Sequence, residues 1–236
     1  MTHPLLQIEP AGSGRRISVL ATVRQNGDMH PQRVGRDVLR DRQLAITGDP
    51  WWMLDQVHGV DSWTVPNGAP IDAVAAHGDV LVADRANVDL AVWVADCAPL
   101  VLIGDTGAVV AAHGGWRGLA DGVVDVALDK LSEVANQVAA AVLGPVIHPG
   151  CYEFDAADLE RVAAGVHADV AAIGGQTSWG SLALDVPAAV AAALERSGVT
   201  LDVVGPCTGC DDRWYSHRCG AEPERHAVVA SIRAVA

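Results

Sequence analysis

Short apolar runs alternate along the chain with longer stretches in which apolar residues recur at helical spacing. The short runs are rich in Val, Ala and Leu and end at Gly, Asp or Pro, which is typical of buried strands. The longer stretches have one apolar face, which is typical of helices that cover a sheet. Strands are predicted at residues 16–23, 51–57, 79–83, 90–95, 100–103, 107–112, 138–143, 199–204 and 227–235, and helices at 32–46, 117–136, 156–168 and 187–197.

The order of these segments predicts the fold class. Four strands follow one another between residues 79 and 112 with no room for helices, so neighbouring strands are expected to pair as hairpins. The sheet is therefore expected to be mixed and not purely parallel. The Gly- and Pro-rich stretches at 66–70 and 174–180 read as connections within a domain, and no internal repeat is present. The pattern predicts an α+β fold in which residues 1–236 form a single domain, with helices over a mixed β-sheet.

Composition narrows the range of functions. The chain has 236 residues and a formal net charge of −13, which argues against a nucleic-acid partner because such proteins carry a basic face. No apolar run is long enough to span a membrane, and the first ten residues lack the basic and apolar parts of a secretory signal. The five cysteines form an odd set that is best kept reduced. These features predict a cytoplasmic protein.

Three strand ends carry residues that suit a metal ion. His58, Cys97 and His113 each follow an apolar segment, and loops held by rigid strands are where such folds place ligands. Two imidazoles and one thiolate form a good ligand set for Zn²⁺ with an open fourth position. The spacing matches no short metal motif, so each residue could equally be a buried or capped polar group.

The segment after His113 suggests an anion site. Gly114 and Gly115 let the backbone approach a ligand closely, and Arg117 adds a fork of donors before the most regular helical pattern of the chain. A phosphate would fit there, although an ordinary turn with a solvated Arg117 explains the same residues.

A second candidate metal site lies near the C-terminus. Cys207 and Cys210 have C-x-x-C spacing, and His217, Cys219 and His226 follow them. This set could form a closed zinc site or a redox pair, but the second C-x-x-C pair of a zinc ribbon is missing.

Several ordered motifs resemble those of one family, from about Gln32 to the C-terminus. It is the polyphenol oxidase or laccase-domain family, also called YfiH-like, which is associated with purine nucleoside phosphorylase activity. The motifs that carry the resemblance are Gln56-Val57-His58-Gly59, Ala95-Asp96-Cys97-Ala98-Pro99, His113-Gly114-Gly115-Trp116-Arg117-Gly118, Gly144-Pro145-Val146-Ile147, Cys151-Tyr152-Glu153, Leu184-Asp185-Val186-Pro187, Cys207-Thr208 and Ser216-His217-Arg218, with Arg225 after them.

The resemblance implies an α/β/α sandwich and a zinc ion held by His58, Cys97 and His113. It also implies phosphorolysis of adenosine, inosine, guanosine and methylthioadenosine, together with deamination of adenosine to inosine. The expected partners are thus a purine nucleoside and phosphate. Asp96 is the candidate carboxylate for proton transfer, with orientation of a ligand imidazole as its alternative role. The expected substrate-binding residues are Gln56, Gly114, Gly115, Arg117 and Arg218, of which Arg117 would also act in catalysis by holding the phosphate.

Three other functions stay open at this stage. The first is a copper oxidoreductase acting on phenols, which would need more His ligands than the motifs supply. The second is a Cys–His hydrolase in which Cys97 is the nucleophile and an amide of a cell-envelope precursor is cleaved. The third is a scaffold that keeps the metal but has lost turnover, because the family's usual Ser-Tyr-Arg-Arg ending appears here as Ser216-His217-Arg218-Cys219.

Overall fold

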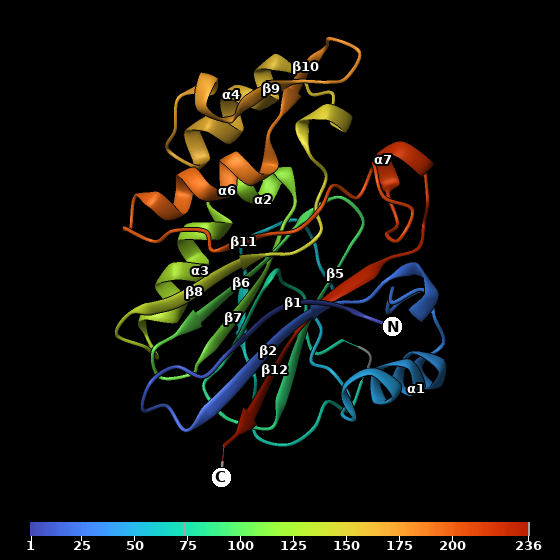
Figure 1. The fold of residues 1–236 in the computed structure, drawn as a ribbon, viewed down its shortest axis with the longest axis vertical. Helices are drawn as coiled ribbons and strands as arrows, with labels where there is room; N and C mark the ends of the chain where they lie inside the picture. The colour runs from blue at the N-terminus through green and yellow to red at the C-terminus, as the bar shows by residue number, and fades with distance from the viewer. Residues whose placement is uncertain (73, 236) are drawn as a thin grey trace.

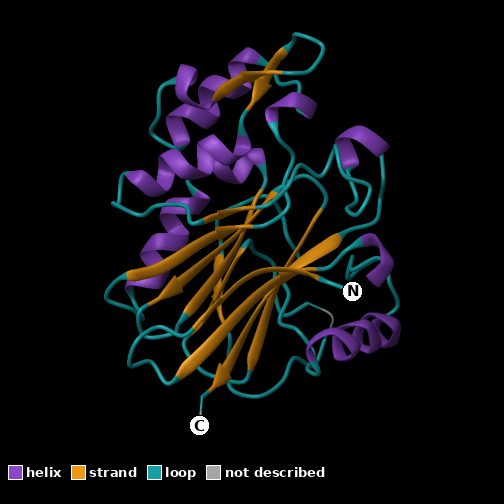
Figure 2. Cartoon of the chain, in the orientation of Figure 1, coloured by secondary structure: helices purple, strands orange, loops and turns teal. Residues whose placement is uncertain are grey.

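Two β-sheets form the centre of the computed structural model, which describes residues 1–72 and 74–235 (Figures 1 and 2). The larger sheet has the strand order β11-β8-β6-β7-β4-β3. It is mixed, because β3 pairs with β4 and β11 with β8 in parallel while the other pairs are antiparallel. Its strands are β3 (Ser62–Thr64), β4 (Val80–Ala83), β6 (Ala98–Gly104), β7 (Val109–Gly114), β8 (Val138–Leu143) and β11 (Val203–Val204).

The smaller sheet has the order β1-β2-β12-β5 and is antiparallel throughout. It packs face to face on the larger sheet, and alternate residues such as Val19, Leu81, Val101 and Val228 fill the core between them. Its strands are β1 (His3–Ile8), β2 (Arg15–Ala21), β5 (Val88–Val94) and β12 (His226–Ala234).

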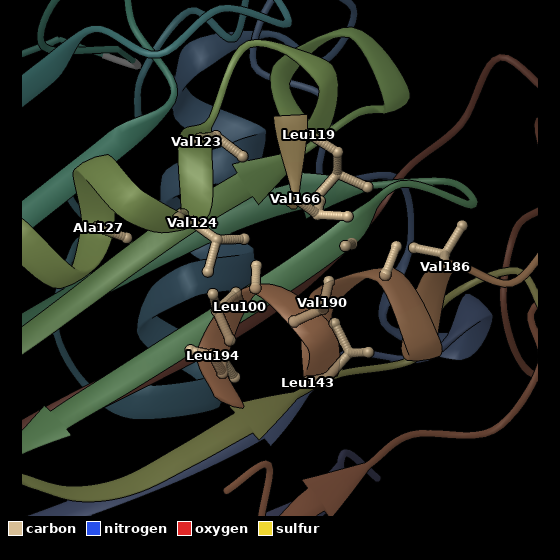
Figure 3. Packing of buried hydrophobic residues seen from close by; sticks show 14 of the residues in the cluster. Leu100, Leu119, Val123, Val124, Ala127, Leu143, Val166, Val186, Val190 and Leu194 are labelled. Atoms are coloured by element: carbon tan, nitrogen blue, oxygen red, sulfur yellow. The ribbon is translucent and has the colours of Figure 1, made fainter. Parts of the chain in front are cut away.

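Helices cover both outer faces of this pair of sheets. On the larger sheet, Leu100 and Leu143 meet side chains of α3 and α6, such as Val124 and Leu194 (Figure 3). On the smaller sheet, Leu39 of α1 packs in a cluster with residues of β5 and β12. The helices are α1 (Arg36–Thr47), α2 (Trp116–Ala120), α3 (Val123–Ser132), α4 (Ala156–Gly165), α5 (Val170–Ile173), α6 (Val186–Glu195) and α7 (His217–Gly220), with 3-10 turns at Arg24–Asn26 and Pro149–Cys151 and a small hairpin of β9 (Gly174–Gln176) and β10 (Leu182–Leu184).

The predicted fold class is confirmed, since helices flank a β centre that contains a mixed sheet. The hairpin expectation holds for β6 and β7 but is wrong for β5, which pairs with β12 in the other sheet, while β4 pairs with β7. Nearly every residue of β5 is buried, so its sequence has no polar alternation that would indicate which sheet it joins. Among the described residues, none of the helices is long and apolar enough to cross a lipid bilayer.

Three predicted elements differ from the structure. The helix expected at 117–136 is two helices, because Gly122 adopts a left-handed conformation (φ +87°) between α2 and α3. The strand expected at 51–57 is an extended segment with only isolated bridges from Trp52 and Asp55. The strand expected at 199–204 is limited to β11.

Candidate metal centre

Two imidazoles and one thiol converge at one end of the larger sheet. His58 lies on the loop before β3, Cys97 lies in the turn that joins β5 to β6, and His113 lies in β7. One ligand atom from each residue lies within 4.8 Å of the other two. The Cys97 Sγ is 3.9 Å from His58 Nε2, and the two imidazole rings are 4.8 Å apart and nearly perpendicular. The predicted set of metal-ligating residues is therefore assembled by the fold.

Strand register explains how Cys97 reaches His113. The antiparallel pair of β6 and β7 places Ala98 opposite Gly114 and Pro99 opposite His113. Cys97 directly precedes Ala98, the first residue of β6. Its thiol therefore lies beside the end of β7, where His113 stands. His113 is buried, Cys97 is partly exposed and His58 is exposed, so the site opens toward solvent on the His58 side. An open side is what a catalytic metal site requires.

A buried carboxylate that sequence analysis missed organises this site. The Asp79 side chain is fully buried, and its Oδ1 lies 2.8 Å from His113 Nδ1. It also accepts backbone N–H bonds from His58 (3.0 Å) and Gly59 (2.8 Å). The bond to Nδ1 leaves His113 Nε2 facing the other ligands, which is the usual arrangement of a carboxylate, an imidazole and a metal ion. No spacing rule links residues 79, 58 and 113, so only the fold identifies this role.

Ionisation within the centre follows from the same contacts. Burial acts to raise the pKa of Cys97, but the imidazoles of His113 and His58 outweigh it and lower that pKa to about 6. Burial acts to lower the pKa of His113, but the Cys97 thiolate and Asp79 outweigh it and raise that pKa to about 9. By contrast, burial and neighbouring thiols raise the pKa of Cys151 above its ordinary value. The lowered pKa of Cys97 favours its thiolate, the form that binds metals.

The two glycines after His113 have different neighbours. A Cβ on Gly115 would lie 2.3 Å from His58 Cδ2, so the imidazole occupies the space that a side chain would need. A Cβ on Gly114 would lie 3.1 Å from the Ala98 Cβ, which is a much milder contact. Gly115 therefore allows His58 to approach the other ligands, and an additional role in anion binding stays a prediction.

Asp96 ties two distant segments to the centre. Its Oδ1 accepts the Thr208 hydroxyl at 2.7 Å, and its Oδ2 accepts the backbone N–H of Arg218 at 2.6 Å. Asp96 itself has a left-handed backbone conformation (φ +88°) next to Cys97. Asp96 was also considered as the residue that orients an imidazole of the candidate site. For His113 that residue is Asp79. The carboxylate of Asp96 instead anchors Thr208 and Arg218 beside the candidate metal ligands.

The other predicted substrate residues lie in different settings. Both polar atoms of the Gln56 side chain bond the backbone of Trp93, at 2.7 and 3.0 Å, so Gln56 fastens the His58 loop to β5. Arg218 is exposed, and its guanidinium lies 4.7 Å from the centre of the Tyr152 ring. Arg117 is also exposed, and its guanidinium lies 4.4 Å from the centre of the Trp116 ring. Neither guanidinium makes an ion pair within the described residues.

A hollow of about 660 Å³ lies beside Arg218. Its size is in the range of small-molecule sites, and its lining combines aromatic rings, carboxylates and a cation. Tyr152 connects this hollow to the metal centre: its ring lies 5.2 Å from that of Phe154, and burial followed by the Cys97 charge raises its pKa to about 12. The hollow is lined by Cys151, Glu153, Phe154, Asp155, Trp179, Arg218 and Cys219.

Sequence comparison shows similarity to proteins of one kind. A family profile described as multi-copper polyphenol oxidoreductase laccase matches residues 18–233, a longer span than the motifs alone covered. A protein of Streptomyces coelicolor named purine nucleoside phosphorylase is 38% identical over 193 residues, which cover 77% of this chain and 76% of that one. The protein YlmD of Geobacillus stearothermophilus, also named purine nucleoside phosphorylase, is 33% identical and covers 77% and 73%.

Solved structures share the fold. The crystal structure of YlmD from Geobacillus stearothermophilus has a TM-score of 0.76 and 25% identity, covering 95% of this chain and 94% of that chain. The Bacillus licheniformis hypothetical protein YfiH has a TM-score of 0.78 at 21% identity, covering 97% and 96%. The arrangement of two sheets and flanking helices is therefore common to these proteins.

Proposed function

The chain belongs to the multi-copper polyphenol oxidoreductase laccase family, and we propose that it is a zinc-dependent purine nucleoside phosphorylase. The proposed substrates are adenosine, inosine, guanosine and methylthioadenosine with inorganic phosphate, and deamination of adenosine to inosine is the proposed side activity. The observation that carries the proposal is the cluster of His58, Cys97 and His113, with ligand atoms within 4.8 Å, in a chain similar to proteins named purine nucleoside phosphorylases.

The donor set supports zinc as the ion. Two imidazole nitrogens and one sulfur suit Zn²⁺, and the Asp79 carboxylate holds His113 in the tautomer that presents Nε2. When bound, the ion would supply Lewis acidity at its open side. The protein's own part is to hold three ligands in place and to leave that side accessible, which agrees with the exposure of His58.

Phosphate binding is proposed for the exposed arginines. Phosphorolysis forms a bond between a phosphate oxygen and C1′ of the ribose as the bond from C1′ to the base breaks, so the phosphate must be held in line with that bond. Arg218 is the stronger candidate, because its backbone N–H is fixed by Asp96 and its guanidinium lines the hollow. Arg117 lies on the Trp116 ring and would serve as a second cation.

Aromatic rings and Asp96 complete the proposed site. Phe154 and Trp179 line the hollow and offer faces on which a purine could stack. Asp96 is held in a fixed position by Thr208 and Arg218, and it is the proposed carboxylate for moving protons during deamination.

The proposal is tested with zinc-loaded protein, adenosine and phosphate. We expect adenine and ribose 1-phosphate to form only when phosphate is present, and inosine to form with or without phosphate. His113→Ala should abolish both reactions, whereas the matched control His167→Ala should retain them because His167 lies on the surface beside Asp125. Zinc-loaded parent protein that releases no purine base from any of the four nucleosides would refute the proposal. Oxidation of phenols by a copper-loaded sample would support the oxidoreductase alternative instead.

One geometric observation favours a second candidate function. Cys97, His113 and Asp79 form a series of thiol, imidazole and carboxylate, which is also the arrangement of a cysteine hydrolase. Such a hydrolase would cleave an amide without metal and would lose activity when Cys97 is alkylated. The two functions are separated by chelation, since a zinc-dependent phosphorylase loses activity with its metal while the hydrolase retains it.

A further inference from the structure

Four of the five cysteines gather at a second place in the fold, which we call the thiol cluster (Cys151, Cys207, Cys210 and Cys219). The Sγ atoms of Cys151, Cys207 and Cys210 all lie within 4.8 Å of one another, and those of Cys151 and Cys210 are 3.2 Å apart. The fourth thiol is close by: the position of a Cβ on Gly209 would be 2.6 Å from Cys219 Sγ and 3.1 Å from Cys151 Sγ.

Segments far apart in the sequence bring these thiols together. Cys151 ends the 3-10 turn Pro149–Cys151, and Cys219 lies in α7. Cys207 and Cys210 lie in the turn between them, which an isolated bridge from Cys207 attaches to Val146. The C-x-x-C spacing indicates Cys207 and Cys210 but not Cys151, which lies 56 residues before Cys207 (207 − 151). His226, a candidate partner by its place in the sequence, is fully buried in β12.

We propose that the thiol cluster is a second metal site, a closed four-cysteine site for Zn²⁺. Four thiolates are a common ligand set for structural zinc, and the C-x-x-C pair supplies two of them from one turn. The backbone N–H of His148 donates to Cys207 Sγ (3.4 Å), a bond that helps to hold a ligating sulfur. Gly209 leaves open the space that the sulfurs occupy, since any side chain there would collide with Cys219 and Cys151.

The number of thiols favours a metal ion over a disulfide. A bond between Cys151 and Cys210, whose sulfurs are 3.2 Å apart, would leave the Cys207 sulfur, within 4.8 Å of both, outside the disulfide. A tetrahedral ion uses that sulfur and can recruit Cys219 as the fourth ligand. The soft character of four thiolates also selects zinc over magnesium or calcium.

The position of the thiol cluster indicates what the ion does. Each of three proposed ligands is the direct neighbour of a residue beside the candidate metal centre of His58, Cys97 and His113, called here the first centre. Cys151 precedes Tyr152, Cys207 precedes Thr208, and Cys219 follows Arg218. Thr208 and Arg218 are the residues that bond Asp96. An ion in the thiol cluster would therefore lock the two segments that form one wall of the first centre, in the manner of a structural site.

Metal analysis of variants tests this proposal and does not depend on the proposed activity. Protein purified under reducing conditions should contain two zinc ions per chain. Cys97→Ser, the matched control, should lose the ion of the first centre and keep the ion of the thiol cluster. Cys207→Ser or Cys210→Ser should also contain one ion per chain, at the first centre, and should lose the ion of the thiol cluster. In the cobalt-substituted Cys97→Ser protein, the intense absorption of several thiolates bound to cobalt should persist, and a further Cys210→Ser substitution should remove it.

Two results would overturn the proposal. One is a single zinc ion per chain that Cys97→Ser removes completely, which would leave the thiol cluster without metal. The other is a disulfide between Cys151 and Cys210 in protein that has never been exposed to a chelator, found by peptide mass spectrometry. If Cys207→Ser does not fold, the zinc count and cobalt spectrum of Cys97→Ser still decide the matter. A single ion lost only with Cys210→Ser would refute the first centre while leaving this site intact.

Discussion

Replacing Asp79 with asparagine tests whether one buried carboxylate organises the metal ligands. The Asp79→Asn side chain has nearly the same shape but only one acceptor oxygen and no charge. In the parent protein the two carboxylate oxygens receive four bonds, from His113 Nδ1 and from the backbone N–H groups of Val57, His58 and Gly59. Whichever way the amide is turned, its NH₂ group faces donors that previously had an acceptor.

The magnitude follows from these contacts. Oδ1 serves His58 and His113, and Oδ2 serves Val57 and Gly59, so asparagine leaves two of the four donors without an acceptor. A buried donor without a partner costs roughly 1–3 kcal/mol, so the metal-free variant should lose about 2–6 kcal/mol of unfolding free energy. Loss of a carboxylate behind a metal-bound imidazole weakens metal binding by about 10- to 100-fold, or roughly 1.4–2.8 kcal/mol.

Two measurements separate these effects. Competition with a coloured chelator gives the zinc Kd, and urea unfolding in excess chelator gives the stability of the metal-free protein. Asp89→Asn is a matched control, because Asp89 is equally buried but pairs with Arg233 in the smaller sheet (2.7 and 3.0 Å). We expect Asp89→Asn to lose stability without any change in the zinc Kd of the first centre.

Asp79 does not organise the ligands if Asp79→Asn binds zinc at the first centre as tightly as the parent protein does. The same conclusion follows if Asp89→Asn weakens zinc binding equally, because the effect would then be a general consequence of lower stability. Zinc counts are made in the Cys210→Ser background, so that the thiol cluster does not contribute to the titration.

Three further predictions concern other parts of the chain. Gly115→Ala should displace the His58 ring, which a Cβ would approach to 2.3 Å, and weaken zinc binding by about 10-fold or more. Gly114→Ala, the control, should change the zinc Kd little. Equal effects in zinc titrations of the two variants would contradict this prediction. In metal-free protein the Cys97 thiolate should be half formed near pH 6, because the adjacent imidazoles lower its pKa more than burial raises it. The ultraviolet difference spectrum between the parent protein and Cys97→Ser measures the thiolate. A midpoint above pH 8 would be inconsistent with the geometry. Burial lowers the pKa of His226 to about 3. Between about pH 6.5 and pH 3 the unfolded chain therefore binds a proton that the folded chain does not. The free energy of unfolding should fall by up to about 1.4 kcal/mol for each unit by which the pH is lowered in that range. Urea unfolding at several pH values should show a flatter profile for His226→Leu than for the parent protein.

Much of the local structure could be predicted from the sequence because local patterns encode it. The helix at 187–197 was expected with a proline near its start, and α6 begins at Val186 with the Asp185 carboxylate capping the N–H of Ala188 (3.0 Å). Apolar runs predict β4, β6, β7 and β8 of the larger sheet, whereas the three-residue edge strand β3 has no such run and was not predicted. The break at Gly122 was missed, because the buried stripe of Val123, Ala127 and Leu131 continues the helical pattern of the segment before it.

The pairing of strands follows from the packing of the whole chain and not from local sequence. The run that forms β5 is apolar on both faces, and such a run fits either sheet equally well. Its actual partner is β12, which lies more than 120 residues further along the chain. Pairing over such a distance depends on how the whole set of strands packs, and no local signal in the sequence of β5 specifies it.

His58, Cys97 and His113 could be recognised as possible metal ligands from the sequence, because each stands at the end of an apolar segment, where rigid strands present their loops. Only the tertiary structure showed that Asp79 holds two of these ligands and that Cys151 joins Cys207 and Cys210. The type of a residue decides whether its side chain can bind a metal, and the sequence gives that type directly. Orientation and proximity are properties of the folded chain, created when segments distant in sequence pack against one another.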